Sequence, residues 1–340
     1  MSWSHQMSDP SLLAVTLLAT GQVSPPPPLP ENPLSNFLSA FDVSDASASL
    51  SLVQQQTIPS TEQSQPEFSS SRSQILMKPQ LNSSQSSLSL PPEVNPTSGS
   101  QLYQLRLAAL KAGKLYTRLS GNSFYSTWAG ATKQPTHQQW KQLLGQEARA
   151  LSNGQGSNRL GVLVGDSLSL WFPSQLLPGG KLWLNQGISG ENSTQILQRV
   201  STFAQTNPET IYVMAGINDL RQGANNWTIL NNTRLIVRRI KQNHPQAEVV
   251  VQSILPTRLE AIPNSRILYL NQQVRDIAQQ EGANHLDLHP YFTDSQGQMR
   301  RDLTTDGIHL SSQGYRVWQS VLSDVEYTVA SRRYSNSFVN

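Results

Sequence analysis

The sequence contains no cysteine, and it is poor in charged residues and in long hydrophobic runs. Without cysteine there is no disulfide bond, no thiolate nucleophile and no cysteine-ligated zinc, while the redox compartment stays open. Charged residues make up only 14% of the 340 positions, and the formal net charge is +3. No basic run is interleaved with aromatic side chains, so we expect no nucleic-acid partner.

The one candidate targeting segment is the apolar run LLAVTLLA at residues 12–19. It is shorter than any bilayer span, so the sequence predicts no transmembrane segment here. A secretory signal has a basic stretch before its apolar run, whereas residues 1–11 contain no Lys or Arg. The sequence therefore favours a cytoplasmic protein over an exported one.

Composition and pattern divide the chain into four parts. Residues 1–100 are rich in Ser, Pro and Gln and carry seven acidic residues against two basic ones. Such a segment buries too little apolar surface to offset the entropy of ordering, so it predicts a disordered tail whose partner the sequence does not identify. We expect a helical lead-in over residues 101–152, an α/β domain over residues 153–327 and a flexible C-terminal tail over residues 328–340.

The lead-in has apolar residues at helical spacing, beginning with Leu102 and Leu105. Thr136 and Gln139 have the spacing of a capping box, which predicts a second helix starting there. The segment contains seven Lys or Arg and one acidic residue. We expect these helices to pack on the following domain with their charges in solvent; a membrane-surface role is the alternative.

From residue 159 onward, short apolar runs alternate with amphipathic helical patterns. The runs at residues 160–164, 211–215, 249–254 and 283–288 are rich in β-branched residues, and residues 181–188 form a weaker fifth run. Alternating strands and helices predict an α/β fold, with a mostly parallel five-stranded sheet covered by helices on both faces.

Ligands bind such sheets at the carboxyl ends of the strands, and four unusual segments fall there. Gly165-Asp166-Ser167-Leu168 follows the first strand and places a Ser hydroxyl and N–H group at the sheet rim. Asn185-Gln186-Gly187 ends the second strand, and a Gly there allows a backbone N–H to approach a substrate. Each pattern alone also fits an ordinary turn.

The other two segments supply an amide and an acid–base pair. Asn218, after the third strand, would offer its side-chain N–H to the same rim. Near the C-terminus, Asp306 precedes His309 by three residues in a loop turned by Gly307. A carboxylate so placed can accept the imidazole Nδ1–H and leave Nε2 to take a proton from a serine hydroxyl.

Taken together, these segments resemble the four blocks of the SGNH hydrolases, also called GDSL esterases and lipases, over roughly residues 158–326. The resemblance implies a three-layer α/β/α, flavodoxin-like fold that needs no metal or cofactor. It implies a triad of Ser167, Asp306 and His309, with Ser167 as the nucleophile that forms an acyl-enzyme. It also implies an oxyanion hole formed by Ser167, Gly187 and Asn218.

The expected substrate is a small-molecule ester, either an acetylated sugar or an acyl lipid. The loops of the α/β domain are short and include no insertion large enough for a lid, which favours short acyl chains. A lysophospholipase, lipase or thioesterase that acts on longer chains is the alternative within this family.

Two interpretations outside serine hydrolysis remain open at this stage. His285, Asp287 and His289 alternate along one strand and share a face, which would suit a zinc site if the strand bent. The domain could also be an inactive glycan- or lipid-binding module. Against this, a module without catalysis has no need to keep Ser, Asn, Asp and His together.

Overall fold

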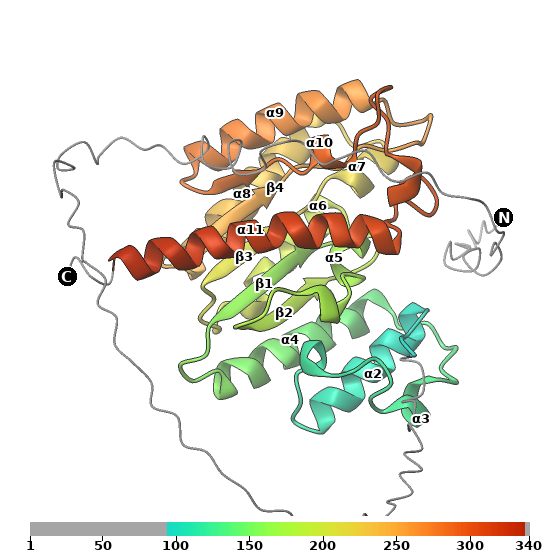
Figure 1. Cartoon of the computed structure of the whole chain (residues 1–340), viewed down its shortest axis with the longest axis vertical. Coiled ribbons are helices and arrows are strands. Elements are labelled where there is room, and N and C mark those ends of the chain that lie inside the picture. Colours follow the sequence, from blue (N-terminus) through green and yellow to red (C-terminus); the bar gives the residue numbers. More distant parts are fainter. Residues whose placement is uncertain (1–93, 337–340) are drawn as a thin grey trace, which may run out of the picture. The chain divides into compact units, whose positions relative to one another are not determined.

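The computed structural model describes residues 94–336, so residues 1–93 of the predicted disordered tail lie outside the described residues. Its centre is a sheet of five strands in the order β2-β1-β3-β4-β5, and every neighbouring pair is parallel (Figure 1). The strands are β1 (Leu160–Gly165), β2 (Leu182–Gly187), β3 (Thr210–Val213), β4 (Glu248–Gln252) and β5 (Asn284–Leu286). The five predicted strands are thus confirmed, with ends that shift by a few residues.

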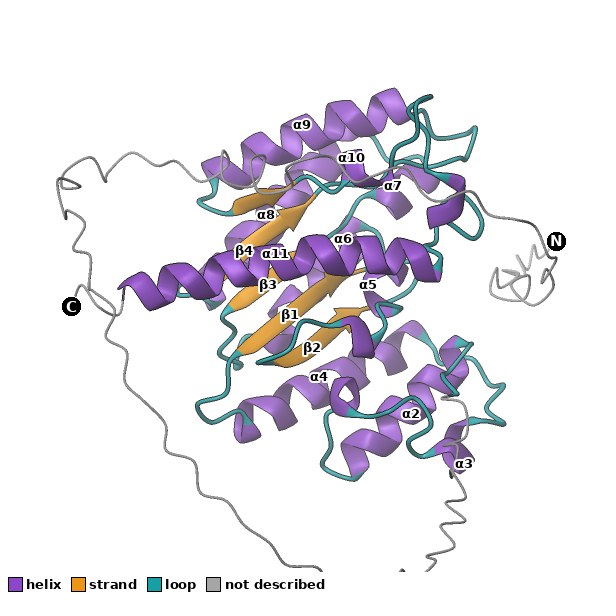
Figure 2. Ribbon diagram, in the orientation of Figure 1, coloured by secondary structure: helices purple, strands orange, loops and turns teal. Residues whose placement is uncertain are grey.

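Helices cover both faces of the sheet, as the α/β pattern predicted (Figure 2). Side chains of β1 alternate between the faces: Leu163 packs towards one layer of helices, and Val162 and Val164 pack towards the other. One layer contains α5 (Ser167–Leu170), α10 (His289–Phe292) and α11 (Ser312–Asn336). The other contains α4 (His137–Gly154), α6 (Ser193–Arg199), α8 (Asn226–Asn243) and α9 (Asn264–Gln280).

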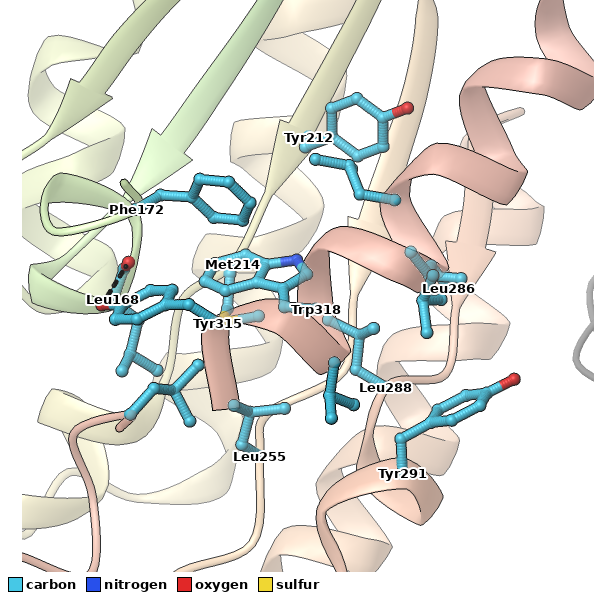
Figure 3. Close-up of a cluster of buried hydrophobic side chains, with 14 of the residues drawn as sticks. Leu168, Phe172, Tyr212, Met214, Leu255, Leu286, Leu288, Tyr291, Tyr315 and Trp318 are labelled. Atoms are coloured by element: carbon cyan, nitrogen blue, oxygen red, sulfur yellow. Dashed lines mark hydrogen bonds between the residues drawn. The ribbon is translucent and has the colours of Figure 1, made fainter. Parts of the chain in front are cut away.

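Helix α11 is longer than the sequence pattern suggested. The predicted flexible tail from residue 328 is wrong as far as Asn336, because the helix continues to that residue. Val325 and Val329 extend its buried apolar face by about two turns beyond Leu322. Near its other end, Trp318 packs edge to face on Phe172 within the buried hydrophobic cluster drawn in Figure 3.

The lead-in packs directly on the α/β domain, as predicted. It consists of α2 (Gly99–Lys111), α3 (Tyr125–Trp128) and α4, and Thr136 forms the expected capping box with Gln139. Trp140 and Leu144 share a buried cluster with Leu170 and Ile188 of the α/β domain. Since β2 is an edge strand, these helices cover an edge that would otherwise face solvent. Across residues 94–336, no helix combines the length and the apolar character that crossing a bilayer requires.

Candidate active site

Ser167 lies where β1 turns into α5, with its side chain largely buried. The turn is fixed by Asp166, whose Oδ1 accepts the N–H of Leu168 at 3.0 Å. Gly165 is required because a Cβ at this position would lie 2.6 Å from the carbonyl oxygen of Met214. The backbone N–H of Ser167 has no acceptor among the described residues, so it is available to a ligand at the rim.

Asp306 and His309 form the pair that their spacing predicted. His309 Nδ1 lies 2.6 Å from Asp306 Oδ2, and Asp306 Oδ1 accepts the backbone N–H of His309 at 2.8 Å. Gly307 turns the loop at a φ of 92°. Burial acts to raise the pKa of Asp306, but the hydrogen bonds from His309 and Ile308 outweigh it and hold that pKa well below the ordinary value. Asp306 is therefore an ionised partner that fixes the imidazole.

A small apolar cavity joins the segments that carry these residues. It is lined by Asp166 and Leu168 on either side of Ser167, by Ile217 before Asn218 and by Ile308 before His309. The rest of its wall comes from Met214, Ala215, Ile254, Leu255 and Pro256. The Ser, Asn and His segments, which are far apart in the sequence, therefore meet at one place. Its free volume is about 10 Å³, which is room for about one water molecule.

A second link between these segments comes from Tyr315 of α11. Its hydroxyl donates to the carbonyl of Leu168 at 3.1 Å, the bond drawn as a dashed line in Figure 3. Tyr315 is buried and follows His309 by six residues. The start of α11 is thereby tied to the turn that carries Ser167.

Asn218 belongs to α7 (Ile217–Arg221), and its buried side chain has a fixed orientation. Its Nδ2 donates to the carbonyl of Glu191 at 3.1 Å, and its Oδ1 accepts from Arg221 Nη1 at 3.2 Å. An amide nitrogen has two N–H groups, so one remains for a ligand.

The structure gives Gly187 a packing role. Its N–H already donates to Asn185 Oδ1 at 2.9 Å, and a Cβ there would lie 2.4 Å from the backbone N of Leu170. The predicted use of Gly187 as an oxyanion donor therefore meets an N–H that is already engaged. The Gly187 N–H is engaged because the Asn185 side chain folds back onto it, and the sequence pattern does not reveal this hydrogen bond.

Gly190, three residues further along the same loop, has the properties that the sequence led us to expect at Gly187. It has a φ of 80° in the turn closed by the Glu191 N–H bond to the Ile188 carbonyl, a conformation that favours glycine. Its N–H has no acceptor within residues 94–336. The next residue, Glu191, is the one whose carbonyl binds the Asn218 amide, so Gly190 and Asn218 lie close together.

The alternative zinc site is not assembled. Asp287 pairs with Arg275 at 3.2 Å and also accepts the backbone N–H of His289. His289 Nδ1 contacts the Thr293 hydroxyl at 3.1 Å. In the part of the chain that the structure describes, no three His, Asp or Glu side chains are arranged to hold a metal ion.

Part of the chain matches a known protein family. The profile of the GDSL-like Lipase/Acylhydrolase family matches residues 151–317. These residues form a GDSL-like lipase/acylhydrolase domain. The family so matched is one of lipases and acylhydrolases, and the matched range includes the Ser167, Asn218 and His309 segments. Helices α2 and α3 and most of α4 lie outside the match.

Two curated relatives and one solved structure illustrate the similarity. Platelet-activating factor acetylhydrolase IB subunit alpha1 of Homo sapiens is 28% identical over 170 residues, covering 45% of this chain and 69% of the relative. The Bos taurus protein of that name is 29% identical over 170 residues, with the same coverage. A Streptococcus pneumonia protein whose name refers to platelet activating factor is 24% identical, with a TM-score of 0.51, covering 55% of this chain and 93% of its own. This structural likeness shows the fold.

Proposed function

We propose that the chain is a serine esterase that cleaves short-chain carboxylic esters through an acyl-enzyme on Ser167. The observation that carries this proposal is the hydrogen-bonded pair of His309 and Asp306, in the segment that borders the same small cavity as the Ser167 turn. A serine, an imidazole with a free Nε2 and an ionised carboxylate are the three groups that acyl transfer requires.

In the proposed mechanism, His309 Nε2 removes the proton from the Ser167 hydroxyl as its Oγ attacks the ester carbonyl carbon. Asp306 stabilises the imidazolium that forms. The tetrahedral intermediate collapses, and the alcohol leaves with the proton from His309. Water, deprotonated by the same imidazole, then attacks the acyl group and releases the acid and free Ser167.

The oxyanion of the intermediate would be bound by the N–H groups of Ser167 and Gly190 and by the free side-chain N–H of Asn218. Gly190 replaces Gly187 in this proposal because the N–H of Gly187 already donates to Asn185. Removing one such donor typically costs about 10²–10³-fold in kcat.

The cavity supports a short acyl chain. Its apolar wall includes Leu168, Ile217 and Ile308 and its volume is small, so a short acyl group suits it better than a long one. The curated relatives are named acetylhydrolases, which agrees with this proposal. A lipase or thioesterase that uses long chains would need this cavity to open, and an inactive glycan- or lipid-binding module would need neither a free serine nor a paired imidazole.

Covalent labelling with a fluorophosphonate probe tests the proposal. Wild type should be labelled at Ser167, and Ser167→Ala should lose the label. Ser157→Ala is the matched control, because Ser157 is exposed and precedes β1, whereas Ser167 follows that strand, so its loss should not affect labelling. An unlabelled wild type, or a label that persists in Ser167→Ala, would overturn the proposal.

A further inference from the structure

Helix α4 of the lead-in reaches the loop after β2 through its first residue, His137. Its Nε2 lies 2.7 Å from Oε1 of Glu191. The Glu191 side chain is 1% exposed, whereas that of His137 is 41% exposed. His137 lies before the start of the family match at residue 151, so this contact is made by the part of the chain that precedes the GDSL domain.

Glu191 is the residue through which three parts of the site are connected. Its Oε2 accepts from Arg199 Nε at 2.6 Å, and Arg199 Nη2 donates to the carbonyl of Gly165 in the turn before Ser167. Its main-chain carbonyl accepts from the Asn218 amide at 3.1 Å. It also directly follows Gly190. Any shift of Glu191 therefore moves the Gly190 N–H and the Asn218 amide together.

We propose that His137 is a positioning residue that holds Glu191 and thereby fixes the two oxyanion donors supplied by Gly190 and Asn218. This inference rests on the proposed esterase function. The carboxylate of Glu191 has two partners, Arg199 on the inner side and His137 on the outer side. Without His137 the carboxylate keeps one partner, so the turn from Ile188 to Glu191 gains freedom.

Other contacts of the lead-in hold the end of β2, which directly precedes the turn from Ile188 to Glu191. Arg106 Nη2 donates to the carbonyl of Asn185 at 2.8 Å, and Gln186 Nε2 donates to the carbonyl of Leu144 at 3.3 Å. These contacts fix the end of β2, but they stop before Gly190. Among these contacts of the lead-in, only that of His137 reaches Glu191, the residue next to Gly190. The His137 side chain is partly exposed, so it can be removed without opening the core.

His137→Ala tests the inference in the full chain. We expect kcat for a short-chain ester to fall about 3- to 30-fold, less than the loss of a direct oxyanion donor, with KM changed less than about twofold. His137→Gln retains an N–H donor and should recover part of the activity, and added imidazole should rescue His137→Ala. Gln138→Ala, an exposed neighbour on the same helix, is the matched control and should match wild type. Unchanged kcat in His137→Ala would overturn the inference.

Hydrogen–deuterium exchange provides a readout that does not depend on activity. Residues 188–192 should exchange faster in His137→Ala than in wild type or Gln138→Ala, while the strands keep their protection. Unchanged exchange in this loop would overturn the positioning role, even if the enzyme is active. If wild type showed no esterase activity, the proposed function would fail, and the exchange would still decide whether His137 holds the loop.

Discussion

Asp166 precedes the proposed nucleophile and is a buried carboxyl group with only one satisfied oxygen. Oδ1 accepts the Leu168 N–H, whereas Oδ2 has no hydrogen-bond partner among the described residues. Burial, with a smaller contribution from the carboxylates of Asp219 and Glu191, raises the pKa of Asp166 to about 6, although the Leu168 N–H and the nearby His309 act to lower it. The turn that presents Ser167 is therefore electrostatically costly at neutral pH.

Replacing Asp166 by Asn should stabilise the fold at high pH. The folded pKa of about 6 lies above the ordinary 3.8, so the stability that Asp166 contributes is complete below about pH 3.8 and is lost as pH rises through 6. At pH 8 we expect Asp166→Asn to raise the free energy of unfolding by about 1–3 kcal/mol, and near pH 4 the difference should nearly vanish. Denaturant titrations at the two pH values measure this.

Asp306 is the control for this prediction, because the fold shifts its pKa in the opposite direction to that of Asp166. Its pKa is lowered in the fold, so its stabilisation is present above the unfolded pKa and is lost on acidification. Asp306→Asn should therefore lower stability at pH 8. An Asp166→Asn variant that is less stable than wild type at pH 8 would contradict the account of this turn.

The two glycines of the loop after β2 should respond differently to Ala. Gly187→Ala places a Cβ against the backbone of Leu170 and should cost about 1–3 kcal/mol in unfolding free energy. Gly190→Ala meets no atom within 4 Å but strains a residue with a φ of 80°, so it should disturb the turn and lower kcat about tenfold or more with a smaller loss of stability. Unfolding curves and kcat for both variants check this, and an unchanged kcat in Gly190→Ala would contradict the need for glycine in this turn.

Most of the candidate site was predictable from the sequence because short segments carry its chemistry. Asp306 and His309 are three residues apart, so a local loop is enough to pair them. The choice between Gly187 and Gly190 was not predictable, because it depends on which N–H groups the fold leaves free. The contact of His137 with Glu191 joins residues 54 positions apart and has no sequence signal.

Among the elements, strands and helix starts were easier to predict than the extent of the last helix. Continuous β-branched runs mark strands buried on both faces, and the Thr136 capping box marks the start of α4. The last turns of α11 carry Arg332 and Arg333 and were mistaken for a tail. Val329 is buried in the core cluster, and this tertiary packing, which the local sequence does not show, keeps the end of the chain helical.

The lead-in helices should be needed for a stable GDSL domain. They cover β2, where the Thr117 hydroxyl donates to the carbonyl of Trp183, and Arg106 and Glu147 form a buried ion pair beside them. A fragment of residues 155–340 would expose this edge and the apolar surface of Ile188. We expect that fragment to aggregate or to unfold without cooperativity.

A fragment of residues 94–340, which retains the lead-in, is the control for this prediction. It should unfold cooperatively in a thermal melt followed by circular dichroism. A shorter fragment that melts as sharply as this control would show that the lead-in is dispensable for stability.

Across the whole molecule, the two ends of the sheet have different tasks. The amino ends are closed by a buried ion network in which Lys181 contacts Glu209 at 2.7 Å and also pairs with Glu326 of α11, which accepts the Tyr212 hydroxyl. The carboxyl ends carry the Ser167 turn, the Gly190 loop and Asn218, and α11 begins shortly after His309. The buried ion network thus fixes the amino ends of the strands, while the proposed site residues lie at their carboxyl ends.

The most direct test of the central claim is hydrolysis of p-nitrophenyl esters from acetyl to palmitoyl, with wild type measured beside Ser167→Ala. We expect wild type to cleave acetyl and butyryl esters best and Ser167→Ala to lose activity by about 10³-fold or more. A preference for long chains would contradict the assignment of the small cavity to the acyl group. Equal activity of the two proteins would show that Ser167 is not the nucleophile.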